Sequence, residues 1–426
     1  MIKKVLIITY YWPPSGGAGV QRWLKFTKYF IEHNYVPTVI TVDPSKASYP
    51  VVDKSLNEDV DSRVTVHRTS TFEPYTIYKK IFRKKEIPYS GFANESKPTF
   101  IQQFTRFIRG NLFIPDARKG WNKYALIKAR EVLGKEKFDF IVTTSPPHST
   151  QLIGFHLKKE FNIPWLVDLR DPWTDIYYYK YMNHTFLAKK KDAKLERNIL
   201  ENADKIVVVS ESIKEMFISK SDKIDSEKIH VIPNGFDALD FKITDSIKSK
   251  GRAEFIITYT GTLSNVYDMS GFIRALEGLK GKVKLRIVGR ISKDILNQLD
   301  TDLVEVIDHV EHAQSIKYLF ASDALLLIIP KIENNEGILT GKLFEYLAAR
   351  KPIVGLGPNL GDASQIIKEC DAGKMLEYSD EIGIKQYLTS LINGDSSVDL
   401  TNQNYLNYSR KKLTKDITLI LDSINL

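Results

Sequence analysis

The sequence predicts a two-domain α/β protein built on two doubly wound parallel sheets. Short apolar runs rich in β-branched residues alternate with longer amphipathic segments along the whole chain. The alternation stops at the turn-forming sequence Pro233-Asn234-Gly235, and it restarts after a polar stretch. The length of 426 residues exceeds one ordinary domain, and a hydrophobic content of 43% is enough for two cores.

The expected strands are short, apolar and bounded by polar or turn-forming residues. In the first half they are Lys4–Thr9, Thr38–Val42, Val64–His67, Phe138–Thr143, Trp165–Asp168, Lys205–Val209 and His230–Ile232. In the second half they are Phe255–Thr260, Lys284–Val288, Val304–Asp308, Ala324–Ile329 and Ile353–Gly355. Helices are expected between them, among others at Val20–His33, Asn122–Leu133, Thr150–Phe161 and Leu187–Asn202.

This rhythm divides the chain into two domains and a tail. Residues 1–240 form the first expected domain and residues 241–400 the second, while residues 401–426 are expected to form a terminal helix. The stretch from Thr69 to Arg118 has no strand rhythm and is expected to be an insertion of helices and loops. Ligands of doubly wound sheets bind beyond the carboxyl ends of the strands, so the loops after the strands are where a site is expected.

Composition and hydropathy favour a cytoplasmic protein. Cys370 is the only cysteine, so no intrachain disulfide can form, and this suits a reducing compartment. The apolar run at the N-terminus is too short for a secretory signal, and no run reaches about 18 apolar residues.

The net charge of +9 is partly concentrated in two basic clusters. The first is Lys79, Lys80, Arg83, Lys84 and Lys85, interleaved with apolar residues, and the second is Lys189, Lys190 and Lys191, after Phe186 and Leu187. Each cluster could be an ordinary solvated helical face. Basic amphipathic segments also bind anionic membrane surfaces and lipid diphosphates, which is the functional alternative. No nucleic-acid-binding module accompanies the charge, so no nucleic-acid partner is expected.

A glycine-rich loop, Ser15-Gly16-Gly17-Ala18-Gly19, follows the first expected strand and leads into a helix. Glycines let the backbone approach a ligand, and the N–H groups at a helix N-terminus attract anions. We therefore expect Gly16 and Gly17 to contact a phosphate group, although a plain strand-to-helix turn is the alternative. The loop lacks the dinucleotide-binding fingerprint because Arg22 occupies the position of its third glycine.

A second helix start is expected near residue 340. Thr340 is the expected N-cap, and Gly341, Lys342 and Leu343 form the first turn, where N–H groups and an ammonium can hold a diphosphate. Glu345 is placed to accept hydrogen bonds from ribose hydroxyls. The alternative is an exposed i,i+3 ion pair between Lys342 and Glu345.

Further candidates lie at other strand ends. Arg290 follows one expected strand of the second domain and can neutralise a phosphate, or is an ordinary exposed arginine. Gly261 and Thr262 follow another expected strand and are predicted to form a tight loop beside the ligand.

In the first domain, His148 follows one expected strand, and Asp168, Arg170 and Asp171 end the next. His148 is either a structural histidine or a residue of the site. Asp168, Asp171 and Asp175 lie close together in the sequence, but no Asp-x-Asp pair and no His/Cys cluster accompanies them, so we expect no metal.

Three segments together carry a family signature. They are the Ser15–Gly19 loop, the sequence Val231-Ile232-Pro233-Asn234-Gly235-Phe236-Asp237, and the sequence Phe344-Glu345-Tyr346-Leu347-Ala348-Ala349-Arg350-Lys351-Pro352-Ile353-Val354. With them the chain resembles, over nearly its whole length, the retaining glycosyltransferases of family 4. The resemblance implies the GT-B fold, in which two Rossmann-like domains face a central cleft and a C-terminal helix packs back on the first domain.

The resemblance also implies a nucleotide-sugar donor, such as a UDP- or GDP-sugar, bound chiefly by the second domain. Glu345 matches the ribose-binding glutamate of the family, and Gly341, Lys342 and Leu343 would lie beside the diphosphate. Gly16 and Gly17 would approach it from the first domain. No cofactor beyond the donor is expected.

Three positions depart from the family pattern. Gly337 stands where an earlier glutamate is common, and Glu336 lies one residue before it, which leaves the role of Glu336 open. Thr262, Leu263 and Ser264 stand just after the first strand of the second domain, where the family often has an Arg/Lys pair. The histidine that often follows the fourth strand is displaced, with His148 nearby.

The implied reaction is retaining sugar transfer to a glycan or a lipid-diphosphate-linked acceptor, in cell-surface polysaccharide biosynthesis at the inner face of the membrane. Lys342 and Arg290 would stabilise the leaving diphosphate, and His148 or Asp171 would position the acceptor or the sugar. The alternatives are a nucleotide-sugar 2-epimerase of the same fold and a non-catalytic glycan- or lipid-binding homologue. Donor hydrolysis would exclude the last.

Overall fold

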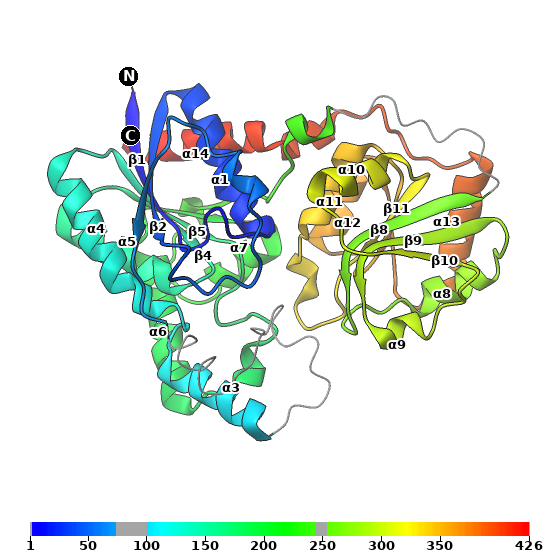
Figure 1. Cartoon of the computed structure of the whole chain (residues 1–426), viewed down its shortest axis with the longest axis horizontal. Helices are drawn as coiled ribbons and strands as arrows, with labels where there is room; N and C mark the ends of the chain where they lie inside the picture. Colours follow the sequence, from blue (N-terminus) through cyan, green and yellow to red (C-terminus); the bar gives the residue numbers. More distant parts are fainter. Residues whose placement is uncertain (1, 74–99, 243–253, 426) are drawn as a thin grey trace. The chain divides into compact units, whose positions relative to one another are not determined.

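The computed structural model describes residues 2–73, 100–242 and 254–425, and the chain folds into two compact units. The first comprises Met1–Pro233 and Arg410–Leu426, and the second comprises Asn234–Ser409. The chain therefore leaves the first unit at Pro233 and returns at Arg410, whereas the sequence suggested residues 240 and 400 (Figure 1). The basic cluster at residues 79–85 lies outside the described residues. No helix in the described part of the chain is long and apolar enough to span a membrane.

The first unit is built on parallel strands in the order β3-β2-β1-β4-β5-β6-β7. The strands are β1 (Lys3–Ile8), β2 (Tyr35–Val42), β3 (Thr65–Thr69), β4 (Phe140–Ser145), β5 (Trp165–Leu169), β6 (Lys205–Val208) and β7 (Ile229–Val231). The order of strands reverses between β1 and β4. This reversal is the topological switch point, at which doubly wound sheets bind ligands.

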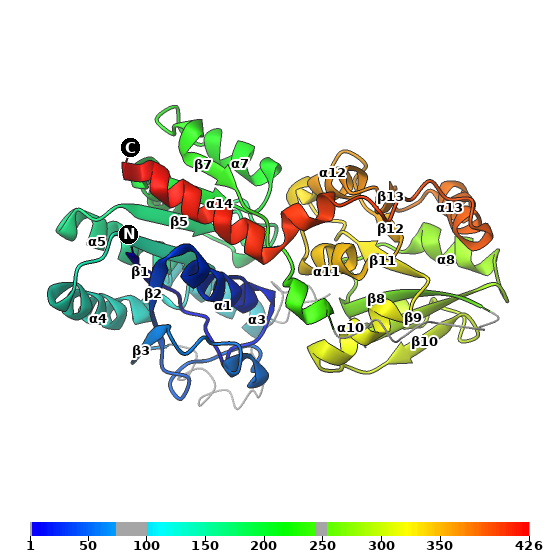
Figure 2. The ribbon, with the colours of Figure 1, turned by 90° about the horizontal axis from the view of Figure 1, so that it is seen from above.

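Helices cover both faces of this sheet because its strands alternate their apolar side chains between two cores. The helices are α1 (Ala18–Phe30), α3 (Phe100–Leu112), α4 (Asn122–Lys135), α5 (Ser149–Phe161), α6 (Phe186–Asn202), α7 (Glu211–Ile218) and α14 (Arg410–Asp422). Val5 and Ile7 pack in one core with α1 and α14, while Leu6 and Ile8 pack in the other with α4 and α5. Figure 2 shows α1 and α14 side by side over the sheet.

The second unit is a smaller parallel sheet in the order β10-β9-β8-β11-β12-β13. Its strands are β8 (Phe255–Leu263), β9 (Val283–Ile291), β10 (Val304–Ile307), β11 (Ala324–Ile328), β12 (Ile353–Leu356) and β13 (Gly373–Leu376). Its helices are α8 (Ser270–Glu277), α9 (Lys293–Leu296), α10 (His312–Phe320), α11 (Gly341–Ala349), α12 (Asp362–Glu369) and α13 (Glu381–Asn393). The switch point lies between β8 and β11.

Two strands of the second unit are longer than the sequence suggested. β8 continues to Leu263 and β9 to Ile291, so Gly261 and Thr262 lie in a strand and not in a tight loop, and Arg290 lies within β9. Glycines make this extension possible. A Cβ built on Gly289 would lie 2.2 Å from the carbonyl oxygen of Gly261, and both glycines have positive φ angles. The sequence also missed β13, a four-residue strand that begins at a glycine.

A buried ion pair explains the arginine that breaks the glycine fingerprint. Asp168, at the end of β5, accepts hydrogen bonds from Arg22 (3.0 Å) and from the indole N–H of Trp23 (2.6 Å), both on α1. It also accepts one from the Thr144 hydroxyl of β4 (2.7 Å). Arg22 donates a further hydrogen bond to the carbonyl oxygen of Pro233, the last residue before the chain enters the second unit (2.6 Å). Asp168 and Arg22 are therefore structural residues.

Candidate active site

The predicted donor residues of the second unit lie around the start of α11, near the switch point between β8 and β11. The ammonium of Lys342 lies 4.9 Å from the ring centroid of Tyr259 in β8 and 6.0 Å from that of Tyr267. Gly261 lets the lysine stem lie close to β8, since a Cβ at this position would be 2.7 Å from Cε of Lys342. The two rings hold the cation by cation–π attraction while leaving it without an anion.

Lys342 has no carboxylate partner among the described residues, and the alternative of an ion pair with Glu345 is not what the structure shows. Thr340 occupies the N-cap position as expected, but its hydroxyl makes no capping bond and is buried without a partner. The first N–H groups of a helix have no partner within the helix, so those of Gly341 and Lys342 are available to an anion. The helix start thus combines an uncompensated cation, a hydroxyl and N–H groups.

Leu343 contributes differently from its neighbours. Its side chain is fully buried in the core under α11, and its N–H donates to the carbonyl oxygen of Thr340 (3.2 Å). The predicted contact of Leu343 with a diphosphate therefore has no free donor in this conformation, and Gly341 and Lys342 remain the better candidates.

Glu345, one turn along α11, is held by a residue that the sequence did not single out. Nε2 of His312, the first residue of α10, lies 3.1 Å from Oε1 of Glu345. Both side chains are partly exposed, so the carboxylate is oriented but accessible. A ligand hydroxyl can reach it.

Arg290 lies on the same side of the sheet edge as Thr262, its register partner across β8 and β9. Its side chain is exposed and has no ion-pair partner in the described part of the chain. Glu336 is exposed on a short 3-10 helix, Asn335–Gly337, while Gly337 is buried. The two residues therefore differ in exposure: Gly337, at the family's glutamate position, is buried, and Glu336, one residue earlier, is exposed.

In the first unit the structure separates the two predicted phosphate-binding glycines. Gly16 packs against the chain itself, since a Cβ there would lie 2.9 Å from the Val51 side chain, and its N–H donates to the Val51 carbonyl oxygen (3.0 Å). Gly17 has φ 104° and open space around its Cα. Only Gly17 presents unoccupied backbone, directly before α1.

The guanidinium of Arg170 joins the start of α1 to the loops after β4 and β5 in the first unit. It donates to the carbonyl oxygens of Ser145 (2.9 Å) and Pro146 (3.3 Å), and it lies against the Cα of Gly19, where a Cβ would be 1.9 Å from a guanidinium nitrogen. The start of α1 and the loops after β4 and β5 therefore meet at this residue, as expected of a switch point.

His148 lies at the end of the loop after β4, directly before α5. Its ring stacks on the indole of Trp173, with centroids 4.8 Å apart and an interplanar angle of 13°. Burial, with Arg170 and Lys220 nearby, lowers the pKa of His148 to about 3. The imidazole is therefore neutral at physiological pH, and its Nδ1 is buried without a hydrogen-bond partner.

The three aspartates considered as possible metal ligands each have a different environment. Asp168 is buried in the Arg22 ion pair, and Asp175 pairs with Lys220. Asp171 is half-buried, and burial raises its carboxyl pKa, which the nearby Arg170 counteracts. Among the described residues no three His, Cys, Asp or Glu side chains are grouped as metal ligands would be.

Residues 82–238 match the sequence model of Glycosyltransferase Family 4. Over these residues the match confirms the resemblance to family 4 that the sequence motifs indicate. Members of this family transfer a sugar from a nucleotide-sugar donor with retention of configuration, so the chain is a glycosyltransferase enzyme.

Solved structures share the fold of this glycosyltransferase at low sequence identity. Sucrose-phosphate synthase from Thermosynechococcus elongatus has a TM-score of 0.64 and 13% identity, with 99% of each chain covered. Anabaena HepE in complex with UDP-glucose has a TM-score of 0.63 and 14% identity, again with 99% of each chain covered.

A proposed UDP-N-acetylglucosamine 2-epimerase from Listeria monocytogenes also shares the fold, with a TM-score of 0.54, 12% identity, and 99% and 96% of the two chains covered. No curated protein sequence matches the chain. The fold is therefore GT-B, and fold alone does not separate transfer from epimerisation.

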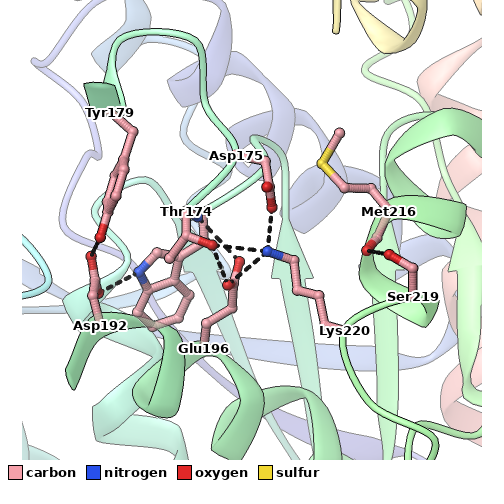
Figure 3. A network of polar contacts seen from close by, with 9 residues as sticks. Thr174, Asp175, Tyr179, Asp192, Glu196, Met216, Ser219 and Lys220 are labelled. Atoms are coloured by element: carbon pink, nitrogen blue, oxygen red, sulfur yellow. Dashed lines mark hydrogen bonds and ion pairs between the residues drawn. The ribbon is translucent and has the colours of Figure 1, made fainter. Parts of the chain in front are cut away.

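A polar network fixes the loop after β5 in the glycosyltransferase (Figure 3). Lys220, just after α7, donates to the hydroxyl of Thr174 (2.9 Å), to Glu196 of α6 (2.8 Å) and to Asp175. Thr174 in turn donates its hydroxyl and its N–H to Glu196 (2.6 and 3.2 Å). The loop is thereby tied to two helices.

The same network reaches His148 through Trp173. Asp192 of α6 accepts from the Trp173 indole (2.9 Å) and from the Tyr179 hydroxyl (3.1 Å). Asp116 accepts from the N–H (2.7 Å) and hydroxyl (2.9 Å) of Ser149, and so caps α5 beside His148. Sequence reasoning missed Trp173, Asp192 and Asp116 because their partners lie far away in the sequence. The one available signal was the position of Trp173, two residues after Asp171.

Proposed function

We propose that this chain transfers a sugar from a UDP- or GDP-sugar to a glycan or a lipid-diphosphate-linked acceptor in cell-surface polysaccharide biosynthesis, without a metal. The single observation that supports this most is Lys342. Its ammonium lies at the start of α11, between two tyrosine rings and without a carboxylate partner among the described residues. A cation kept uncompensated at a helix N-terminus is suited to a diphosphate.

In the proposed reaction the bond between the anomeric carbon and the diphosphate oxygen breaks, and charge accumulates on the leaving diphosphate. Lys342 and the N–H groups of the first turn stabilise this charge in place of a metal, and exposed Arg290 can add to it. The acceptor hydroxyl attacks from the same face and gives its proton to the leaving oxygen. Glu345 binds the ribose hydroxyls and so orients the donor.

The first unit supplies the proposed acceptor side. Neutral His148 is fixed by Trp173 and can donate one hydrogen bond and accept another, which suits positioning better than charge stabilisation. Asp171 has a raised pKa and lies one residue after Arg170, whose guanidinium holds the surrounding loops. Gly17 offers open backbone to an anionic group of the ligand. We also propose a peripheral location at the inner face of the cell membrane, where lipid-linked acceptors occur.

The test has two steps. Thermal shift with UDP, GDP, UMP and GMP should show stabilisation by one diphosphate more than by its monophosphate, because the second phosphate engages Lys342. Donor hydrolysis by the wild type should then release the free sugar slowly with its anomeric configuration retained. Conversion of the donor to its 2-epimer would instead establish the epimerase alternative, and absence of binding to every nucleotide would contradict the proposal.

A further inference from the structure

Two neighbouring segments of the first unit expose large apolar side chains. On α3 these are Phe104, Phe107 and Leu112. On the stretch that leads from Tyr179–Met182 into α6 they are Tyr181, Phe186 and Leu187, of which Phe186 and Leu187 are 78% and 76% exposed. Single exposed apolar residues are ordinary, whereas a group of this size marks an interaction site. We call these six residues, with Lys189–Lys191, the α3–α6 face.

Direct contacts join the two segments into one surface. The side-chain amide of Asn111, in the last turn of α3, donates to the carbonyl oxygen of Asn183 (3.1 Å) and accepts from the N–H of Thr185 (2.7 Å). Gly110 packs against Met182, since a Cβ there would lie 2.6 Å from the Met182 carbonyl oxygen. Phe107 lies one helical turn before Asn111, and Phe186 directly follows Thr185. Figure 1 shows α3 outside the layers of the sheet, next to the segment leading into α6.

The burial pattern of α3 is the reverse of that of a core helix. Arg106 is buried, while the aromatic side chains of Phe104 and Phe107 are exposed. A helix stabilised by packing normally turns its aromatic side chains inward. α3 instead turns two aromatic side chains toward solvent. This arrangement favours a binding partner that has an apolar interior, such as a lipid bilayer.

The charges of the α3–α6 face have one sign. Residues 100–112 and 179–191 contain the basic residues Arg106, Arg109, Lys180, Lys189, Lys190 and Lys191 and no Asp or Glu. The three consecutive lysines of α6 are exposed beside Phe186 and Leu187. Aromatic and leucine side chains enter the boundary between lipid headgroups and acyl chains, while lysines are attracted to anionic headgroups. Both features complement an anionic bilayer better than a protein surface of mixed charge.

We propose that the α3–α6 face docks the enzyme on an anionic lipid bilayer, with Phe186 and Leu187 inserted and Lys189–Lys191 against the headgroups. The proposal rests on the peripheral location proposed above and names the surface responsible. It is independent of the donor site, because it concerns residues of the first unit that no step of the transfer uses.

The test is co-sedimentation of the full chain with vesicles of equimolar phosphatidylcholine and phosphatidylglycerol, and with vesicles of phosphatidylcholine alone. The wild type should bind the anionic vesicles, more weakly at high salt. The variant Phe186→Ser/Leu187→Ser should bind at least about tenfold more weakly because two apolar side chains no longer leave water. The variant with Lys189, Lys190 and Lys191 replaced by Gln should also lose at least about tenfold and show a smaller salt dependence.

Matched controls lie in the second unit. Leu360→Ser removes an apolar side chain that is 98% exposed, and Lys317→Gln/Lys368→Gln/Lys385→Gln removes the same charge from exposed lysines. Both should bind like the wild type. UDP- and GDP-induced thermal shifts of every variant report folding and the donor site separately.

Failure of the wild type to bind anionic vesicles overturns the membrane docking, and equal binding to both kinds of vesicle contradicts its electrostatic part. Wild-type binding that both α3–α6 variants retain overturns the assignment to this face. Vesicle binding without any nucleotide-induced shift would leave the docking face standing and contradict the proposed transfer.

Discussion

The imidazole of His312 holds the carboxylate of Glu345, with 3.1 Å between Nε2 and Oε1. Glu345 lies in the segment that resembles the family signature, whereas His312 comes from another helix and belongs to no motif. The carboxylate is therefore oriented from one side and accessible from the other. This arrangement predicts a positioning role for His312 in ribose binding.

His312→Ala should weaken UDP or GDP binding about tenfold, since an oriented, charge-assisted hydrogen bond is lost. It should weaken binding of the matching 2′,3′-dideoxynucleotide much less, because that ligand has no ribose hydroxyls. Calorimetry measures both affinities. His312→Gln can still donate to Glu345 and should restore most of the discrimination. An unchanged ratio between the two ligands in His312→Ala would refute the positioning role.

Lys342→Ala should lower kcat by about 100-fold, because it removes a cation that stabilises the leaving diphosphate. KM for the donor should change less, since N–H groups of the helix start still bind the ground state. Steady-state release of the nucleoside diphosphate measures both constants. Lys368→Ala, an exposed lysine of the same unit, is the control. Near-normal turnover by Lys342→Ala would contradict the proposed stabilisation of the leaving group by Lys342.

Asp168→Asn should destabilise the first unit by about 3–5 kcal/mol, because the fully buried Arg22 loses its counter-charge. All five tryptophans lie in this unit, so urea unfolding followed by tryptophan fluorescence reports it selectively. Glu131→Gln, which breaks an exposed pair with Lys128 and Lys135, should leave the unfolding midpoint unchanged. Equal midpoints for Asp168→Asn and the wild type would contradict the structural role.

The lowered pKa of His148 predicts a pH dependence of stability. The folded state keeps the imidazole neutral down to about pH 3, whereas the unfolded chain takes up a proton near pH 6.5. The unfolded state thus binds more protons in this window. The contribution of His148 to stability therefore falls as the pH falls from 6.5 toward 3 and is nearly constant above 6.5.

Between pH 7 and pH 5 the wild type should therefore lose about 2 kcal/mol that His148→Gln does not lose. Urea unfolding followed by tryptophan fluorescence at the two pH values measures the free energy of unfolding of each protein. The contributions of other titrating groups cancel in the difference between the wild type and the variant. Parallel losses in both proteins would show that His148 is protonated in the folded state.

The sequence predicted most of the fold because local patterns carry that information. Val5 to Ile8 read as an apolar, β-branched strand, and the structure buries all four between two helical layers. It missed β13 because four residues beginning at a glycine give no pattern, and it ended β8 and β9 early because glycine usually ends a strand.

The candidate site was only partly predictable. Lys342 and Glu345 stood out because a helix start and a family segment coincide there. The burial of Gly16 against Val51, the stacking of His148 on Trp173 and the contact of His312 with Glu345 join residues far apart in the chain. No spacing rule in one sequence encodes such pairs.

By itself the sequence determined that this protein has two doubly wound domains, because alternating hydrophobicity is local. From helix-start chemistry, which is also local, it predicted a nucleotide-sugar site in the second domain. Only the tertiary structure decided which polar residues are paired within the protein and which remain available to a ligand. Asp168 is neutralised inside the first unit, while Lys342 remains without a carboxylate partner among the described residues. The reason is physical: whether a charge is available depends on its burial and partners, and folding sets both.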